Sequence, residues 1–166
     1  MYNLQDLVVY CSHGVCRIEQ IEERIVDKKP VSYYVLSPMA SEKTKFYVPM
    51  HNAAALRKMR YLLTKEELLQ ILRDPALRDE GWISSDNLRK NRYKELLAGI
   101  DFFAIAQMVC HLKRYQQAQI AQGKRFHQSD ESFLRDAQKV LASEMAAVLQ
   151  VPASALLEKV AELICT

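Results

Sequence analysis

The sequence predicts an α+β protein in which a small antiparallel β-barrel precedes an all-α helical bundle. Short β-branched and aromatic runs separated by tight turns fill residues 1–50. From residue 64 onward, apolar residues recur with the 3.6-residue period of helices. Because strands and helices are segregated along the chain, we expect two domains, residues 1–56 and residues 57–166.

Four short segments have the composition of strands. They are residues 7–10, 15–21, 31–36 and 44–48. The second alternates apolar with polar residues, which is typical of a half-buried strand. Polar turn signals separate the segments, and Pro49 ends the last one. No connection is long enough for a crossover helix, so we expect antiparallel strands that close into a small barrel.

Residues that can cap a helix mark the start of about five helices. Such caps stand at Asn52, at Thr64 in a capping box with Glu67, at Ser85 or Asp86, at Asp101, and at Ser129. The predicted helices end at Asp74–Pro75, at Gly123 and at Val151–Pro152.

The helix after Ser85 or Asp86 is expected to run through Leu88, Tyr93, Leu96 and Leu97. Residues 76–85 form a linker that contains the only tryptophan, Trp82. A last helix is expected from Pro152 or Ser154 to the end of the chain.

The positive charge is unevenly distributed. The formal net charge is +3, and residues 1–60 account for all of it, since the remaining residues carry equal numbers of acidic and basic side chains. A neutral C-terminal part is not a general polyanion binder, so any nucleic-acid contact must come from local basic patches.

The sequence also indicates a compartment. The first residues lack a basic region followed by an apolar run, and no apolar stretch approaches the roughly 20 residues that cross a bilayer. The four cysteines are scattered, and we expect free thiols. These features favour a cytoplasmic protein.

Several segments, taken in order, match one known pattern. The N-terminal matches are residues 8–22, the Tyr-Tyr-Val-Leu strand at 33–36, and residues 48–53 followed by Leu56-Arg57. The C-terminal matches are residues 92–95, 123–134 and 137–144. Each segment is weak alone, but in this order the chain resembles the CarD family of bacterial RNA-polymerase-binding regulators. The resemblance implies a small barrel of the Tudor or SH3 type followed by a compact helical domain, in agreement with the pattern above.

The resemblance implies that an edge strand of the barrel binds the lobe of the RNA polymerase β subunit. Arg24 matches an arginine that family members use at this contact, and Tyr47 falls where another such arginine often stands. The alternative is that Arg24 is a solvated strand residue and Tyr47 a cross-strand packing residue.

The resemblance further implies that the helical domain contacts promoter DNA and stabilises the open complex. Trp82 would insert into the minor groove at the upstream edge of the bubble. The phosphate contacts would come from Arg89, Lys90, Arg92, Lys94, Lys113, Arg114, Lys124 and Arg125. Family members have their tryptophan about three residues before the Arg-Tyr-Lys motif, whereas Trp82 lies ten before Arg92 and Arg89 holds the expected place. The alternatives are a packing tryptophan and a solubilising helix face.

Two other functions stay open. Cys11, His13 and Cys16, with His51 as a fourth ligand, could form a metal or thiol site, but the paired spacings typical of zinc are missing. No phosphate loop or hydrolase motif occurs. We therefore expect no metal, no cofactor, no enzymatic activity and a monomer. The other alternative is a Tudor-like protein–protein interaction module with a helical scaffold and no DNA role.

Overall fold

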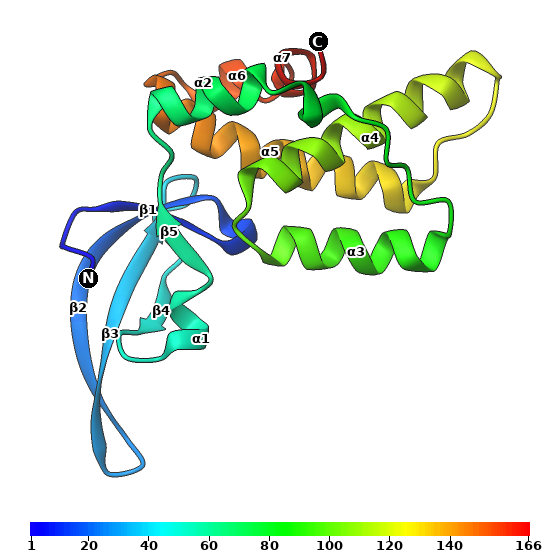
Figure 1. Cartoon of the computed structure of the whole chain (residues 1–166). Helices are drawn as coiled ribbons and strands as arrows, with labels where there is room; N and C mark the ends of the chain where they lie inside the picture. The colour runs from blue at the N-terminus through cyan, green and yellow to red at the C-terminus, as the bar shows by residue number, and fades with distance from the viewer.

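The computed structural model describes residues 1–166, with a β part and an α part lying side by side (Figure 1). The predicted α+β class is confirmed. One antiparallel sheet has the strand order β4-β3-β2-β1-β5. Its members are β1 (Leu7–Tyr10), β2 (Val15–Val26), β3 (Lys29–Pro38), β4 (Phe46–Pro49) and β5 (Met59–Tyr61), with the 3-10 helix η1 (Cys11–His13) between the first two.

The fifth strand moves the predicted domain boundary. Val8 of β1 pairs with Tyr61 of β5, so the strand that completes the sheet lies in the segment assigned to the helices. The chain reaches β5 through the single-turn helix α1 (Ala53–Leu56), which Asn52 caps as predicted by accepting a hydrogen bond from the Ala55 N–H at 3.0 Å. The first domain therefore ends after Tyr61 and not at residue 56.

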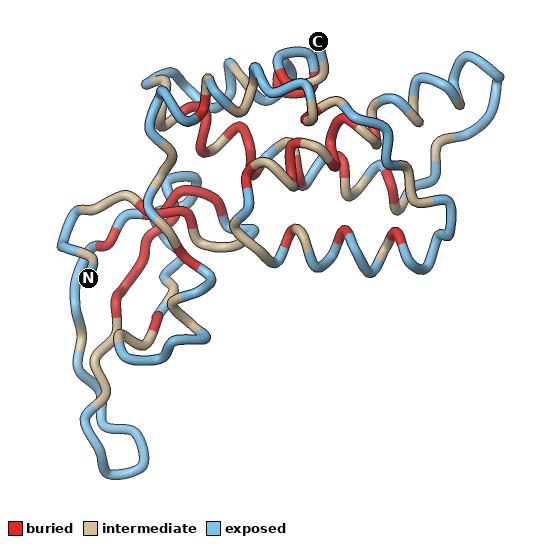
Figure 2. The backbone as a smooth tube through the Cα atoms, viewed as in Figure 1, coloured by how far each residue is buried: buried red, intermediate tan, exposed pale blue.

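The sheet curls around a small apolar core to which all five strands contribute. The core residues are Val8, Cys16, Ile18, Tyr34, Leu36, Val48 and Met59. In Figure 2 these strand segments are coloured as buried where they face one another. A register shift between Ile18 and Gln20 marks the point at which β2 leaves this core.

Beyond the core, β2 and β3 continue as a two-stranded ribbon that projects from the molecule (Figures 1 and 2). Asp27 and Lys28 form its turn with φ angles of 50° and 64°. Such left-handed conformations are those of the two-residue hairpin turn that matches strand twist. Most side chains of the ribbon are exposed, so it lies outside the apolar core of the sheet.

Seven further elements form the α part. They are α2 (Lys65–Arg73), the 3-10 helix η2 (Pro75–Arg78), α3 (Asp86–Ala98), α4 (Phe102–Ala121), α5 (Gln128–Leu149), α6 (Ala153–Leu156) and α7 (Val160–Cys165). The predicted caps Thr64, Ser85 and Asp101 each accept a backbone hydrogen bond at a helix start. The last predicted helix is split into α6 and α7.

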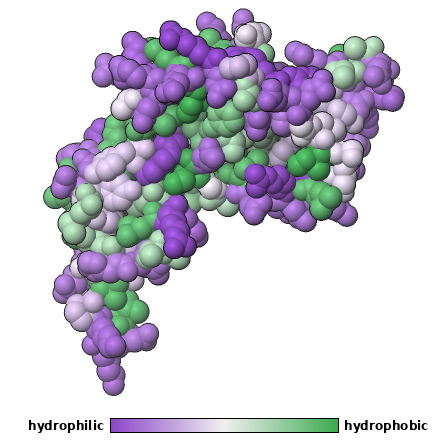
Figure 3. All heavy atoms as spheres, viewed as in Figure 1, coloured by the Kyte–Doolittle hydropathy of each residue, from purple (hydrophilic) through white to green (hydrophobic).

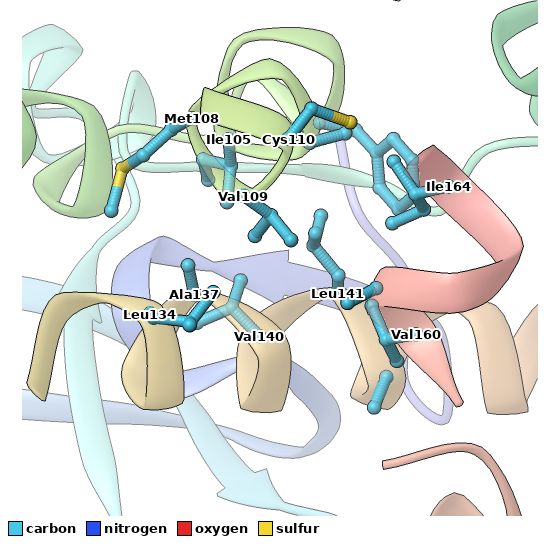
Figure 4. Packing of buried hydrophobic residues seen from close by; sticks show 14 of the residues in the cluster. Ile105, Met108, Val109, Cys110, Leu134, Ala137, Val140, Leu141, Val160 and Ile164 are labelled. Atoms are coloured by element: carbon cyan, nitrogen blue, oxygen red, sulfur yellow. The ribbon is translucent and has the colours of Figure 1, made fainter. Parts of the chain in front are cut away.

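One core of 20 buried residues holds these helices together. It lies mainly between α4 and α5, with Val160 and Ile164 of α7 covering one side (Figure 4). None of the helices is both long and apolar enough to span a membrane.

The helix α3 contains the predicted apolar residues, and the structure shows which of them face the core. Tyr93 and Leu97 are buried, whereas Leu88 is 64% exposed and its neighbour Arg89 only 2% exposed. Arg89, Tyr93 and Leu97 follow one another at the four-residue spacing of a single helix face, and this is the face that packs on the core.

Candidate functional site

Arg24 and Tyr47, the two residues expected at the polymerase contact, touch each other on the outer face of the sheet. The Arg24 guanidinium lies over the Tyr47 ring, 4.1 Å from its centroid. Arg24 Nε also donates a hydrogen bond to Glu22 Oε2 at 3.1 Å. Arg24 lies opposite Val31 and Tyr47 opposite Val35, and these positions on β3 share one face because side chains alternate along a strand. Cation and ring together form an exposed patch, which we call the Arg24–Tyr47 patch.

The backbone next to this patch is free to accept another strand. β4 lies at the edge of the sheet and pairs only with β3, through Tyr33 to Leu36. The ribbon formed by Arg24–Val26 and Lys29–Val31 has no third strand beside it. Ile25 is 71% exposed there, and Figure 3 shows apolar surface near the end of the projecting hairpin. An open edge with apolar side chains is the geometry used for strand addition by a partner.

Trp82 is held between two side chains. Its ring stacks on Tyr115 of α4 with 3.9 Å between centroids and 11° between planes. The Arg89 guanidinium lies 4.5 Å from the Trp82 ring centroid. Because the Tyr115 ring stacks directly on one face of the indole, the Arg89 guanidinium must lie on the other face. Both faces of the Trp82 ring are therefore covered. Trp82 thus packs within the α part, and only its edges are available to a ligand.

Arg89 holds together three segments at the end of the α part that is remote from the sheet (Figure 1). Its Nε and Nη2 donate to the two carboxylate oxygens of Asp130, both at 2.9 Å. Nη1 donates to the Ile83 carbonyl at 2.9 Å, and Nη2 also donates to Asp86 at 2.7 Å. Asp130 is fully buried, Arg89 is only 2% exposed, and four of its five guanidinium N–H groups donate hydrogen bonds within the α part. The guanidinium therefore lies out of reach of a phosphate, which contradicts the predicted DNA contact of Arg89.

The other basic residues of α3 remain accessible. Arg92 and Lys94 are exposed, and Lys90 is half-buried. Arg92 makes only a surface ion pair with Glu95, at 3.2 Å. Such pairs are weak and exchange readily with other anions. Lys90 and Lys94 are four residues apart and share one face of α3, whereas Arg92 lies on the opposite flank of the helix.

A second basic region extends along α4 and the loop after it. Residues 102–129 contain no Asp or Glu, and they carry Lys113, Arg114, Lys124 and Arg125. Lys124 and Arg125 are exposed in the loop. Arg114 Nη2 donates to the Arg78 carbonyl at 2.6 Å, so this side chain also serves the packing of η2 on α4. The loop is therefore the better candidate for phosphate contact.

The two parts of the molecule are joined by a polar clamp that the sequence pattern does not reveal. Arg60 of β5 donates to both carboxylate oxygens of Glu144 on α5, each at 2.7 Å. Arg60 also donates to the Ile100 carbonyl, and Glu144 accepts the Leu63 N–H at 2.9 Å. Glu144 is only 2% exposed, so this pair fixes the position of α5 against the sheet.

A second contact lies beside the clamp. The Val15 N–H donates to Ser143 Oγ at 3.0 Å. A Cβ at Gly14 would lie 2.7 Å from that oxygen, and Gly14 has a φ of 74°. The turn can approach α5 this closely only because residue 14 is glycine.

Cys11, His13 and Cys16 do not converge on one point. The His13 ring stacks between Tyr10 and Phe46, with centroid distances of 5.6 and 4.1 Å. Burial raises the pKa of the Cys16 thiol to about 12. No group of three or more His, Cys, Asp or Glu side chains is arranged to hold a metal ion. The residues of this alternative therefore serve packing.

Comparison with known proteins assigns the N-terminal part. Residues 2–60 match the protein family described as CarD-like/TRCF RID domain. The RID domain family binds the RNA polymerase β subunit. The matched segment contains the Arg24–Tyr47 patch and reaches into β5. No curated protein matches the chain.

Proposed function

Because residues 2–60 belong to the CarD-like/TRCF RID domain family, we propose that this chain is a transcription regulator that docks on the RNA polymerase β subunit and stabilises the promoter open complex. The sheet would bind the β lobe, and the α part would contact DNA near the upstream edge of the bubble. The observation that carries this proposal is the Arg24–Tyr47 patch beside the open edge of β4.

The patch suits a protein partner. An arginine stacked on an exposed aromatic ring loses little side-chain freedom on binding, because the ring already restrains it. Arginine and tyrosine are also enriched among the residues that dominate interface energies. Backbone pairing along β4 or the ribbon would supply affinity, and the patch would supply specificity.

The charge distribution supports tethered, weak DNA binding. Residues 61–166 have no net charge, so the exposed cations Arg92, Lys94, Lys124 and Arg125 and the half-buried Lys90 act against a neutral background. On free duplex DNA they should bind poorly and with strong salt dependence. Docking on polymerase raises the local concentration of DNA, so weak contacts suffice. No catalytic role is proposed.

A second candidate follows from the α part itself. Both faces of Trp82 are covered, and Arg89 is engaged by Asp86 and Asp130. These contacts favour a rigid scaffold over a wedge that enters DNA. In this alternative the chain is a polymerase-binding interaction module without a DNA role.

Affinity for a purified β-lobe fragment tests the docking step. Arg24→Glu and Tyr47→Ala should each weaken binding about tenfold or more, because truncating an anchoring residue typically costs over 1 kcal/mol. Arg17→Glu is the matched control, since Arg17 is an exposed arginine on the same strand. Equal binding by all three variants would contradict docking through this patch.

Promoter-opening kinetics with polymerase separate the two candidates. Wild type is compared with Lys124→Glu/Arg125→Glu and with Trp82→Ala, all at saturating protein. A shorter open-complex lifetime in the loop variant supports the DNA role. If the β lobe binds normally and neither variant changes the lifetime, the scaffold alternative holds. An effect of Trp82→Ala alone would return the wedge role to this residue.

A further inference from the structure

Two cysteines from distant parts of the chain meet where the last helix packs on α4. Cys110 lies in the middle of α4, and Cys165 is the last residue of α7. Their sulfur atoms are 2.9 Å apart, and both thiols are free. Figure 4 shows the Cys110 sulfur pointing towards α7. Val160 and Ile164 of α7 are fully buried against the core, so this meeting is built into the packing.

Charged side chains of both signs surround the pair. Arg78 of η2 and Arg114 of α4 lower the pKa of both cysteines, and Lys113 lowers that of Cys165. The hydrogen bond between the two sulfurs lowers the pKa of Cys165 below its ordinary value, and the three cations add to this while burial opposes it. The same hydrogen bond, together with burial, raises the pKa of Cys110. The thiolate therefore forms more readily on Cys165 than on Cys110.

Small molecules can reach the pair. A shallow cavity of about 340 Å³ is lined by both cysteines together with Lys113, Arg114, Glu158 and Glu162. Cys165 is half-buried at its surface, and Cys110 lies below. An anionic sulfur, a thiol partner and an accessible opening are the three features of a reversible oxidation site.

We propose that Cys110 and Cys165 form a peroxide-sensitive thiol pair that closes to an intramolecular disulfide. The Cys165 thiolate attacks one oxygen of hydrogen peroxide, the O–O bond breaks, and the other oxygen leaves as hydroxide. The attacked oxygen stays on sulfur as the sulfenic acid of Cys165. The Cys110 thiol then attacks that sulfur, the S–S bond forms, and water leaves. Two thiols lose two electrons, and one peroxide is reduced to two waters. A dithiol reductant reverses the reaction.

The other two cysteines provide a contrast within the same chain. Burial raises the pKa of both Cys11 and Cys16 above ordinary values. Their nearest polar partners are carbonyl oxygens, those of Lys58 and Gly14, and not another thiol. No hydrogen bond joins either of them to another thiol, so oxidation should favour the pair in the α part.

A disulfide between Cys110 and Cys165 would link α7 covalently to α4. α7 packs against α4, α5 and η2, and η2 leads directly into the linker that holds Trp82. A bond between Cys110 and Cys165 closes a loop of more than fifty residues, for which the loss of unfolded-state entropy is large. The oxidised protein should therefore unfold at a temperature several degrees higher than the reduced one.

The test uses the full chain, reduced and then exposed to hydrogen peroxide at neutral pH. Peptide mass mapping without reductant should give a Cys110–Cys165 linked peptide, and Tm should rise and return on addition of dithiothreitol. Cys165→Ser, Cys165→Ala and Cys110→Ser should abolish both signals, whereas Cys11→Ser, the matched control, should leave them intact. Cys165 is half-buried in the last turn of α7, so its variants are expected to fold.

Three outcomes would overturn the proposal. The first is irreversible oxidation of Cys165 while Cys110 remains a free thiol. The second is a dominant linkage through Cys11 or Cys16, within or between chains. The third is a linked peptide that forms without any change in Tm, which would mean that α7 is not held more firmly. Polymerase binding is not needed for any of these readouts, so the thiol pair and the proposed function are tested separately.

Discussion

Replacing Arg89 should destabilise the α part more than any other single change on α3. Arg89→Ala leaves the Asp130 carboxylate fully buried without its partner, and breaking such a pair costs about 3–5 kcal/mol. The loss of the guanidinium from the Trp82 ring adds up to about 1 kcal/mol. For a chain of this size, we expect Tm to fall by roughly 10 °C.

The assay is thermal unfolding followed by far-UV circular dichroism at pH 7. Arg92→Ala is the matched control, because Arg92 lies one turn further on α3 and makes an exposed pair with Glu95 whose loss costs about 0–1 kcal/mol. Arg89→Met combined with Asp130→Leu should recover most of the stability, since no buried charge is then left alone. If Arg89→Ala costs no more than Arg92→Ala, the structural role assigned to this guanidinium is refuted.

Two further predictions concern pH and the joint between the two parts. Burial lowers the pKa of His111, whose Nε2 lies 2.9 Å from the Asp79 carbonyl, so folding disfavours its protonated form. The unfolded chain then binds the additional proton first, and the free energy of unfolding should fall as pH drops from about 6.5 through the folded pKa. The free energy of unfolding is measured between about pH 7.5 and 5 in steps of about half a pH unit. In His111→Gln its decrease towards low pH should be smaller by the contribution of His111. An unchanged pH dependence would contradict the assignment. Glu144→Gln should weaken the charged hydrogen bonds from Arg60 by about 1–2 kcal/mol and speed tryptic cleavage between the two parts, with Glu95→Gln as an exposed control. Cleavage at the wild-type rate would mean that the clamp does not hold the parts together.

Local chemistry was sufficient to predict most helix starts. Asn52, Thr64, Ser85 and Asp101 all act as caps, because a cap depends only on a side chain and the backbone within three residues of it. The strand β5 could not be predicted in this way. It has three residues, and its only reason to be extended is pairing with β1, more than forty residues earlier.

The candidate site was predictable only where neighbours in sequence define it. The family resemblance indicates Arg24 and Tyr47. Their mutual contact could not be predicted, because it depends on the register of β2 with β3 and of β3 with β4. Arg89 stands in a basic run and looks like its exposed neighbours. The signal that separates it is phase, since Arg89, Tyr93 and Leu97 share one helix face. Its partner Asp130 lies on another helix, so the pair itself could not be read from the sequence.

The clamp between Arg60 and Glu144 holds the β part and the α part in one orientation, in contrast to two domains joined by a flexible linker. A flexible tether would let the α part search a volume around its anchoring point. A rigid joint instead keeps the remote end of α3 and the loop carrying Lys124 at one distance and in one direction from the sheet. While the sheet is docked, the α part can therefore contact only a target that lies at the matching distance and angle.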